Sequence, residues 1–126
     1  IKRLKKFAER AILAKRNIVN LVLECAKKGR VAGLGSPARA NTLLNFTHLD
    51  KDILDYLGEK SGSPKIGLFT PGTHIPVFDE KKILKEQPEY ILMLSWHIGK
   101  ELMKIMRKLG YKGKFIMPLP KPKIID

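Results

Sequence analysis

Apolar residues recur at helical spacing along the first 28 positions of the chain. They stand three or four residues apart, or a multiple of a turn apart, and comprise Leu4, Phe7, Ala11, Ile18, Val22, Cys25 and Ala26. Most lysines and arginines of this segment fall on the other side. The spacing predicts one long amphipathic helix over residues 2–28, ended by Gly29.

The hydrophobic period changes after Gly29. Residues 30–35 read as a short buried strand that runs into a glycine turn. Ser36 and Pro37 are residue types favoured at the N-cap and at the first helical position, so a helix is expected over residues 38–46.

Five further elements and a loop follow from the same reasoning. Strands are predicted at 53–57, where a helix is the alternative, at 90–95, and at 114–117 as the last strand. Helices are predicted from Asp79 to about Glu86 and from His97 to Leu109, with Gly110 as the stop. Residues 61–77 have loop composition, and prolines keep the segment after residue 117 extended.

Strands that alternate with helices predict an α/β fold. We expect a Rossmann-like, three-layer domain with a mostly parallel sheet, preceded by the long N-terminal helix. The 126 residues suffice for one domain. We therefore expect a linker helix at residues 1–29 and the folded domain at 30–126.

The charge and the cysteine content narrow the class of protein. The net charge is +13 and the basic excess lies at both ends of the chain, which suits an anionic partner or simply a lysine-rich solvated surface. One cysteine, Cys25, excludes an internal disulfide and favours a reducing compartment such as the cytoplasm. No apolar stretch is long enough to span a membrane. Because the chain begins at Ile1 without a signal-peptide pattern, we expect it to be a fragment.

The turn after the first strand has the spacing G-x-G-x-x-A, from Gly33 to Ala38. It follows a strand and opens a helix, as the dinucleotide-binding fingerprint requires, so its backbone N–H groups are candidates for binding a phosphate. A plain strand-to-helix turn is the alternative. Asp55 and Glu59 are in range to hold a ribose hydroxyl. Arg39 opposes the helix dipole, which a bound anion would explain and an incidental surface arginine would also satisfy.

Polar residues also follow the ends of other predicted strands. Ligands of open α/β sheets bind outside the carboxyl ends of strands, where Gly35, Ser36, Trp96 and His97 are expected. For His97 a surface position is the alternative. His74 lies in a proline-bounded loop, a usual place for a ligand-binding side chain.

Several classes of function lack support in the sequence. The three histidines are far apart and no close set of metal ligands accompanies them, so we expect no metal site. A serine hydrolase would need a G-x-S-x-G elbow, which is absent. Nucleic-acid binding has only the charge in its favour, because no recognition motif is present.

Five segments together resemble one known family. They are 31–39 (VAGLGSPAR), 41–46 (NTLLNF), 71–77 (PGTHIPV), 88–96 (PEYILMLSW) and 113–118 (GKFIMP). In this order they are similar to the C-terminal domain of S-adenosylmethionine-dependent sugar C-methyltransferases, over about residues 7–122. The PGTHIP loop and the TLLN helix are the most specific of the matches.

The resemblance implies a function and a set of site residues. Enzymes of that family methylate a carbon of a nucleotide-linked sugar, and their zinc-binding and S-adenosylmethionine-binding domains precede this one. We therefore expect a nucleotide-sugar-binding part that binds no cofactor of its own, is not catalytic alone and depends on an upstream methyltransferase domain. The implied contacts are Gly35 and Ser36 with the diphosphate, Arg39 with its charge, Thr73 and His74 with sugar or phosphate, Trp96 with base or sugar, and Asn45 and His97 nearby.

The chain departs from the family pattern at some of these positions. Leu34 stands where tyrosine is frequent, Arg39 where lysine is frequent, and His97 where asparagine usually follows the tryptophan. The segment 59–65 is looser than the usual D-x-N-P pattern, which weakens Glu59 as a ribose ligand. Two other functions stay open: a stand-alone dinucleotide- or small-ligand-binding module, and an interaction domain that binds a polyanion.

Overall fold

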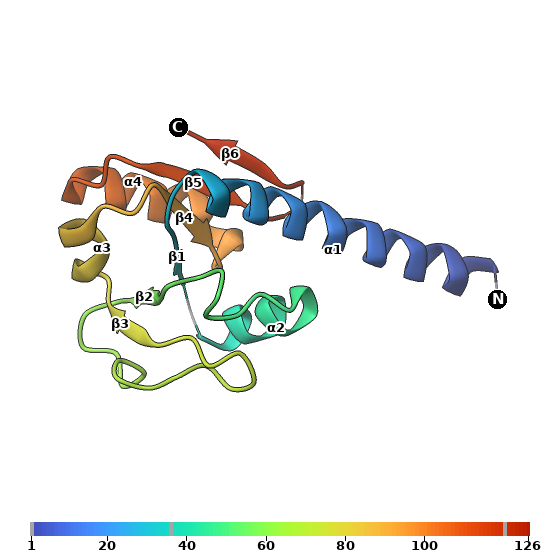
Figure 1. Ribbon diagram of the computed structural model, residues 1–126, viewed down its shortest axis with the longest axis horizontal. Helices are drawn as coiled ribbons and strands as arrows, with labels where there is room; N and C mark the ends of the chain where they lie inside the picture. The colour runs from blue at the N-terminus through green and yellow to red at the C-terminus, as the bar shows by residue number, and fades with distance from the viewer. Residues whose placement is uncertain (1, 36, 120) are drawn as a thin grey trace.

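A computed structural model describes the backbone at residues 2–35, 37–119 and 121–126; the side chains of residues 2 and 37–40 are not described. A six-stranded sheet in the order β3-β2-β1-β4-β5-β6 forms the centre of the fold (Figure 1). Its elements are α1 (Lys2–Lys28), β1 (Val31–Leu34), α2 (Pro37–Thr47), β2 (Leu57–Glu59), β3 (Val77–Asp79), α3 (Lys81–Glu86), β4 (Tyr90–Met93), η1 (Trp96–Ile98), α4 (Gly99–Leu109), β5 (Lys114–Met117) and β6 (Lys123–Ile125).

Five of the six strands are parallel, as the sequence predicts. β1 and β4 are the central pair, and all four residues of each are buried, which explains their unbroken apolar runs. β2 and β3 extend the sheet on one side of this pair, and β5 extends it on the other. We call the side where these strands begin the amino edge and the side where they end the carboxyl edge.

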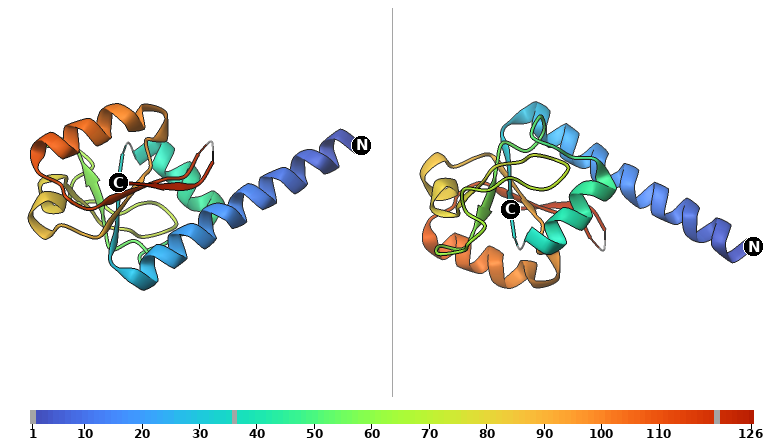
Figure 2. Two further views of the ribbon diagram at one scale, coloured as in Figure 1. Left: turned by 90° about the horizontal axis from the view of Figure 1, so that it is seen from above. Right: turned by 90° about the horizontal axis from the view of Figure 1, so that it is seen from below.

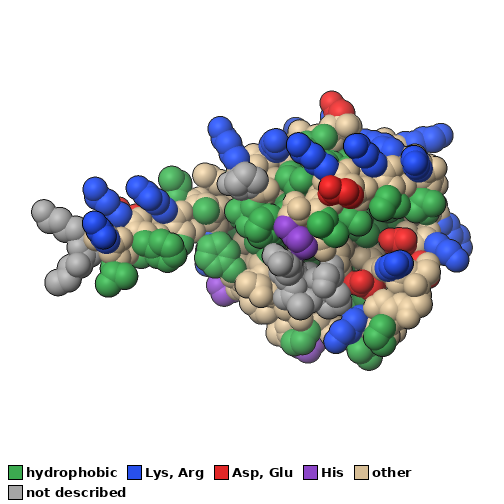
Figure 3. Space-filling view, turned by 180° about the vertical axis from the view of Figure 1, so that it is seen from behind, with side chains coloured by type: hydrophobic (Ala, Val, Ile, Leu, Met, Phe, Trp, Pro, Cys, Tyr) green, Lys and Arg blue, Asp and Glu red, His purple; other side chains and the backbone are tan. Residues whose placement is uncertain are grey.

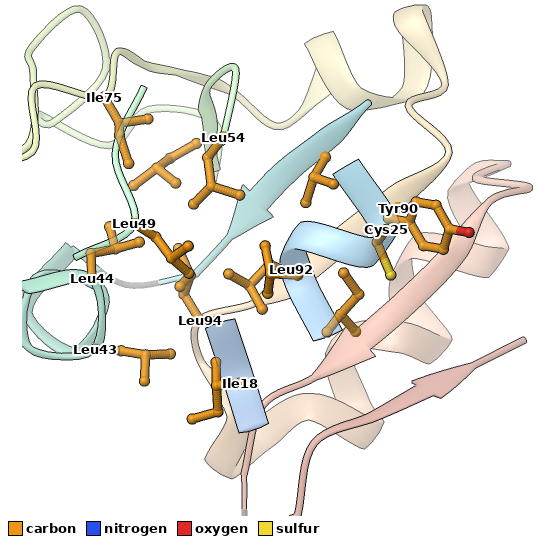
Figure 4. Packing of buried hydrophobic residues seen from close by; sticks show 14 of the residues in the cluster. Ile18, Cys25, Leu43, Leu44, Leu49, Leu54, Ile75, Tyr90, Leu92 and Leu94 are labelled. Atoms are coloured by element: carbon orange, nitrogen blue, oxygen red, sulfur yellow. The ribbon is translucent and has the colours of Figure 1, made fainter. Parts of the chain in front are cut away.

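Helices cover both faces of the sheet and complete three layers. On one face, α1 and α2 pack over a cluster that includes Ile18, Val22, Leu44 and Leu92 (Figure 4). On the other face, side chains of α3 and α4 join a second cluster with Ile91 and Phe115. The α/β, Rossmann-like fold class with a preceding long helix is therefore confirmed.

The long helix α1 covers the predicted residues, but only its C-terminal half lies on the sheet. The N-terminal half projects away from the domain (Figure 2). Cys25 is buried in the contacting half, where burial raises the pKa of its thiol. In the described part of the chain, no helix combines the length and apolarity needed to cross a bilayer.

Local signals explain most helix ends. The Asp79 carboxylate accepts a hydrogen bond from the Lys81 N–H at the start of α3. Gln87 ends α3 and Gly110 ends α4, each in the left-handed conformation. A single 3-10 turn, η1, precedes α4, so the regular helix starts two residues later than predicted.

One predicted strand was misplaced and two strands were missed. Of the predicted strand at 53–57 only Leu57 lies in a strand, because β2 spans Leu57–Glu59. The segment before it begins in a turn, in which the carbonyl of Asp50 accepts the N–H groups of Ile53 and Leu54. β3 lies at the end of the expected loop. β5 is not the last strand, since β6 pairs antiparallel with it beyond the prolines. Three-residue strands carry too few positions to show a period, which is why β3 and β6 escaped the sequence pattern.

Candidate functional site

The carboxyl ends of β1 and β4 lie side by side and carry the polar residues that the sequence singles out. β1 connects to β2 on one side, whereas β4 lies on its other side, so the strand order reverses between β1 and β4. In open α/β sheets the crevice at such a reversal is where ligands bind. Gly35 follows β1 there, and Trp96 and His97 follow β4.

Gly35 brings the two strand ends into close approach. Its φ is +148°, and a Cβ built on it would lie 2.4 Å from Ser95 Oγ and 2.5 Å from the Ser95 backbone nitrogen. Only glycine fits this position, because any side chain would collide with the end of β4. α2 begins two residues later, at Pro37. Ser36 and the Arg39 side chain, predicted to contact a diphosphate, lie outside the described residues.

Trp96 and His97 border a cavity at the carboxyl edge. Their rings meet edge to face with centroids 6.0 Å apart, and His97 is exposed while Trp96 is half-buried. The cavity has a volume of about 280 Å³, and its lining includes Lys100 of α4, Met117 of β5 and Lys123 of β6. The lining also includes the carboxylate of Glu101, so the two ammonium groups leave one net positive charge beside the ring of Trp96. A positive charge beside an aromatic ring suits an anionic ligand with a flat ring.

The proline-bounded loop at 69–77 forms a second group of candidate residues beside α2. Gly72, at φ +81°, approaches α2 so closely that a Cβ would lie 2.9 Å from Asn45 Oδ1. The Asn45 amide in turn donates to the carbonyl of Asn41 over 2.8 Å. Asn45 therefore packs against the loop, about two helical turns from the start of α2.

Within this loop the polar groups differ in their access to solvent. The buried hydroxyls of Thr70 and Thr73 hydrogen bond to each other, and Thr70 Oγ1 accepts the N–H of Ile75 over 2.9 Å. Thr73 thus fixes the loop from inside. His74 is exposed, at φ +55°, with its N–H bonded to the Thr70 carbonyl over 2.9 Å. The His74 imidazole is therefore open to solvent, unlike the hydroxyls of Thr70 and Thr73.

A smaller cavity lies between this loop and α2. Its volume is about 150 Å³, and Asn41, Lys65, Phe69 and Thr70 are among its lining residues. The side-chain oxygen of Asn41 is buried and has no hydrogen-bond partner among the residues that the structure describes. Val77 of β3 also lines the cavity. It is in register with Leu57 of β2, which is in register with Gly33 of β1. Measured along the strands, the cavity therefore lies two residues from Gly35.

The two predicted carboxylates occupy opposite edges of the sheet. Glu59 is the last residue of β2, at the carboxyl edge, and burial together with the nearby Glu80 raises the pKa of its carboxyl group. Asp55 precedes β2, and its N–H bonds to the carbonyl of Val31 at the amino edge. Of these two carboxylates, Glu59 is therefore the one at the carboxyl edge.

Some residues of the site were not predicted to take part. Ser95 reads in the sequence as a simple strand end, yet its backbone and hydroxyl face Gly35. Lys123 gave no signal because β6 was not predicted. Among the described residues no group of three histidine, cysteine or carboxylate side chains is arranged to hold a metal ion.

Comparison with known proteins places this arrangement in a family. The profile of the C-methyltransferase C-terminal domain matches residues 1–120. The chain belongs to this family. It is also similar to the C-methyltransferase NovU of Streptomyces niveus, with 29% identity over 97 residues, which make up 76% of this chain and 23% of NovU. This C-methyltransferase C-terminal domain thus matches less than a quarter of the length of that relative.

Proposed function

We propose that this domain binds the nucleotide-diphosphate part of a sugar substrate for an S-adenosylmethionine-dependent C-methyltransferase. The observation that carries the proposal is the reversal of strand order between β1 and β4, where Gly35 meets Ser95 beside Trp96 and His97. In this fold the crevice at such a reversal is the usual ligand site.

The chemistry of the carboxyl edge suits the parts of such a substrate. The backbone N–H of Ser36 is proposed to donate to the diphosphate, and Arg39 to neutralise it. The Gly35 N–H donates to the Gly58 carbonyl over 3.4 Å, so Gly35 is proposed to contribute through the close approach that its missing side chain allows. The ring of Trp96 offers a face to the base or the sugar. His97 and the two lysines of the adjoining cavity, Lys100 and Lys123, extend the positive region.

The residues of the loop at 69–77 are proposed to act at the sugar end of the substrate. His74 presents a donor or acceptor to solvent, next to the cavity that the loop shares with Asn41. Thr73 and Asn45 hold the loop in that position through Thr70 and Gly72. Contact with the sugar would thus fall to His74, with the other two as positioning residues.

The methyl donor is assigned to another part of the protein. Three quarters of NovU lie outside the match to this chain, which leaves room for a domain that binds S-adenosylmethionine. The donor would supply the methyl group, while this domain holds and orients the acceptor sugar.

A calorimetric titration of the chain tests the proposal, with dTDP-linked and GDP-linked sugars as ligands and NAD as the control. We expect saturable binding of one sugar nucleotide and none of NAD. Binding of NAD in preference would favour the dinucleotide module instead. If neither isolated chain nor intact protein binds a sugar nucleotide, the proposal is wrong.

A further inference from the structure

The apolar stripe of α1 continues past the point where the helix leaves the domain. In the C-terminal half the stripe is buried, with exposed fractions of 1% for Ile18, 0% for Val22 and 1% for Cys25. Moving towards the N-terminus at helical spacing, the same stripe reaches Phe7 and Leu4, which are 72% and 74% exposed. One continuous surface is thus half covered and half bare.

The bare half has the composition of an interface. On the projecting arm, the N-terminal half of α1, most hydrophobic side chains lie on one side and most lysine and arginine side chains lie on the other (Figure 3). Residues 2–16 carry seven lysines and arginines and one acidic residue, Glu9. A second copy of this arm would bring like charges together, so self-pairing is disfavoured. The charge favours a partner with carboxylates at the rim of an apolar groove.

The direction of the arm limits where its partner lies. A helix of 27 residues is about 40 Å long, whereas β1 with four residues spans about 13 Å. The free half of α1 extends on the side where β5 ends and the chain turns towards β6 (Figures 1 and 2). Whatever covers the arm therefore sits next to the carboxyl edge, which holds the candidate site.

We infer that the stripe of Leu4, Phe7, Ala11 and Ala14 is the docking surface for the methyl-donor domain of the same polypeptide. The occupant is argued from the continuity of the stripe with the core, from the charge of the arm and from the three quarters of NovU outside the match. The inference rests on the proposed function. It adds the place of docking: α1 is a rigid arm that holds the donor domain over the crevice between β1 and β4.

The test compares two leucines of the arm in the intact gene product. Leu4 lies on the stripe, while Leu13, 58% exposed, lies nine residues on, about two and a half turns away and so on the opposite side. Hydrogen exchange at residues 4–14 is expected to be at least tenfold slower in the intact protein than in this chain alone. Leu4→Glu should abolish that protection and lower methyl transfer at least tenfold, and Leu13→Glu should do neither.

Three results would overturn the inference. The arm exchanges equally fast in both forms, or Leu4→Glu behaves like Leu13→Glu, or the gene product contains no further domain. Protection conferred on this chain by anionic lipid vesicles, or by a dimer seen in light scattering that Leu4→Glu dissociates, would assign the stripe to a membrane or a second copy. Sugar-nucleotide titration of the Leu4→Glu chain should equal the unmodified chain, so failure here and failure of the proposed function are separable.

Discussion

The two edges of the parallel sheet use their polar groups differently. At the amino edge, side chains bond to one another and to the backbone: the Arg30 guanidinium pairs with Glu86 at 3.2 Å, and the Arg30 N–H donates to the Glu89 carboxylate over 2.9 Å. The buried Tyr111 hydroxyl donates to the carbonyls of Pro88 and Lys114. At the carboxyl edge, Trp96 and His97 border a cavity instead.

The difference separates stability from function. Bonds at the amino edge join the starts of β1, β4 and β5 to the ends of α3 and α4, so they hold the order of the elements. At the carboxyl edge, Trp96 and His97 instead line a cavity with room for part of a ligand. Substitutions at the two edges should therefore have separable effects on unfolding and on binding, which three predictions address in order of decreasing effect.

The largest effect is expected at the amino edge. Tyr111 is 2% exposed and packs edge to face on Phe115, with ring centroids 5.3 Å apart. Tyr111→Ala should lower the free energy of unfolding by about 3–5 kcal/mol, as measured in urea, because it removes a buried ring. Tyr111→Phe should cost about 1–3 kcal/mol, because the carbonyls of Pro88 and Lys114 lose the hydroxyl proton that they share.

Binding provides the control for that prediction. The affinity of the folded fraction for the sugar nucleotide should not change in Tyr111→Phe, since the residue lies at the edge away from the crevice. A tenfold loss of affinity in this variant, without loss of fold, would contradict the separation of the two edges.

At the carboxyl edge the matched comparison is between two glycines. Gly35→Ala places a methyl group against Ser95, whereas Gly62, also at positive φ (+88°), has no atom within 4 Å of its would-be Cβ. We expect Gly35→Ala to weaken sugar-nucleotide binding at least tenfold by calorimetry. Gly62→Ala should leave binding unchanged and cost about 1–2 kcal/mol of stability, because alanine is strained at positive φ. Equal sugar-nucleotide affinity in the two variants would mean that Gly35 is not part of the binding site.

The smallest effect is expected in the pH dependence of stability. Hydrogen bonds from Lys82 and Arg30 lower the pKa of Glu86, and the Arg30 N–H lowers the pKa of Glu89. Because these pKa values are depressed in the fold, their stabilisation is present above the usual glutamate pKa of about 4.3 and is lost as the pH falls through the folded-state values. The urea midpoint should therefore fall on acidification in that range.

Substitution identifies the groups responsible for that fall. The double variant Glu86→Gln, Glu89→Gln should show a flatter acid profile than the unmodified chain. The carboxyl groups of Glu59 and Glu80, whose pKa values burial raises, act in the opposite sense and should remain. An unchanged profile in the double variant would mean that the Arg30 contacts do not contribute.

The sequence predicted the elements whose patterns are long or strongly punctuated. α1 repeats its apolar spacing over several turns, β4 is an unbroken apolar run, and Gly110 marks the end of α4. The outermost strands of the sheet, β3 and β6, were not predictable in the same way. β3 and β6 owe their place to pairing with β2 and β5, and such contacts leave no period in three residues.

The features of the candidate site also divide into those that the sequence predicts and those that it does not. The placement of Gly35, Trp96 and His97 at one edge follows from the rule for strand ends in parallel sheets. The close approach of Gly35 to Ser95, the packing of Gly72 on Asn45 and the arrival of Lys123 from β6 depend on tertiary structure. No local pattern encodes them.

The most direct test of the central claim is an amide NMR titration of the chain with the sugar nucleotide that binds. The account predicts that the largest shift changes fall on Gly35, Ser95, Trp96 and His97, with the amino-edge amides of Arg30 and Lys112 unchanged. Saturable binding with its largest shifts at the amino edge, or along α1, would contradict the account.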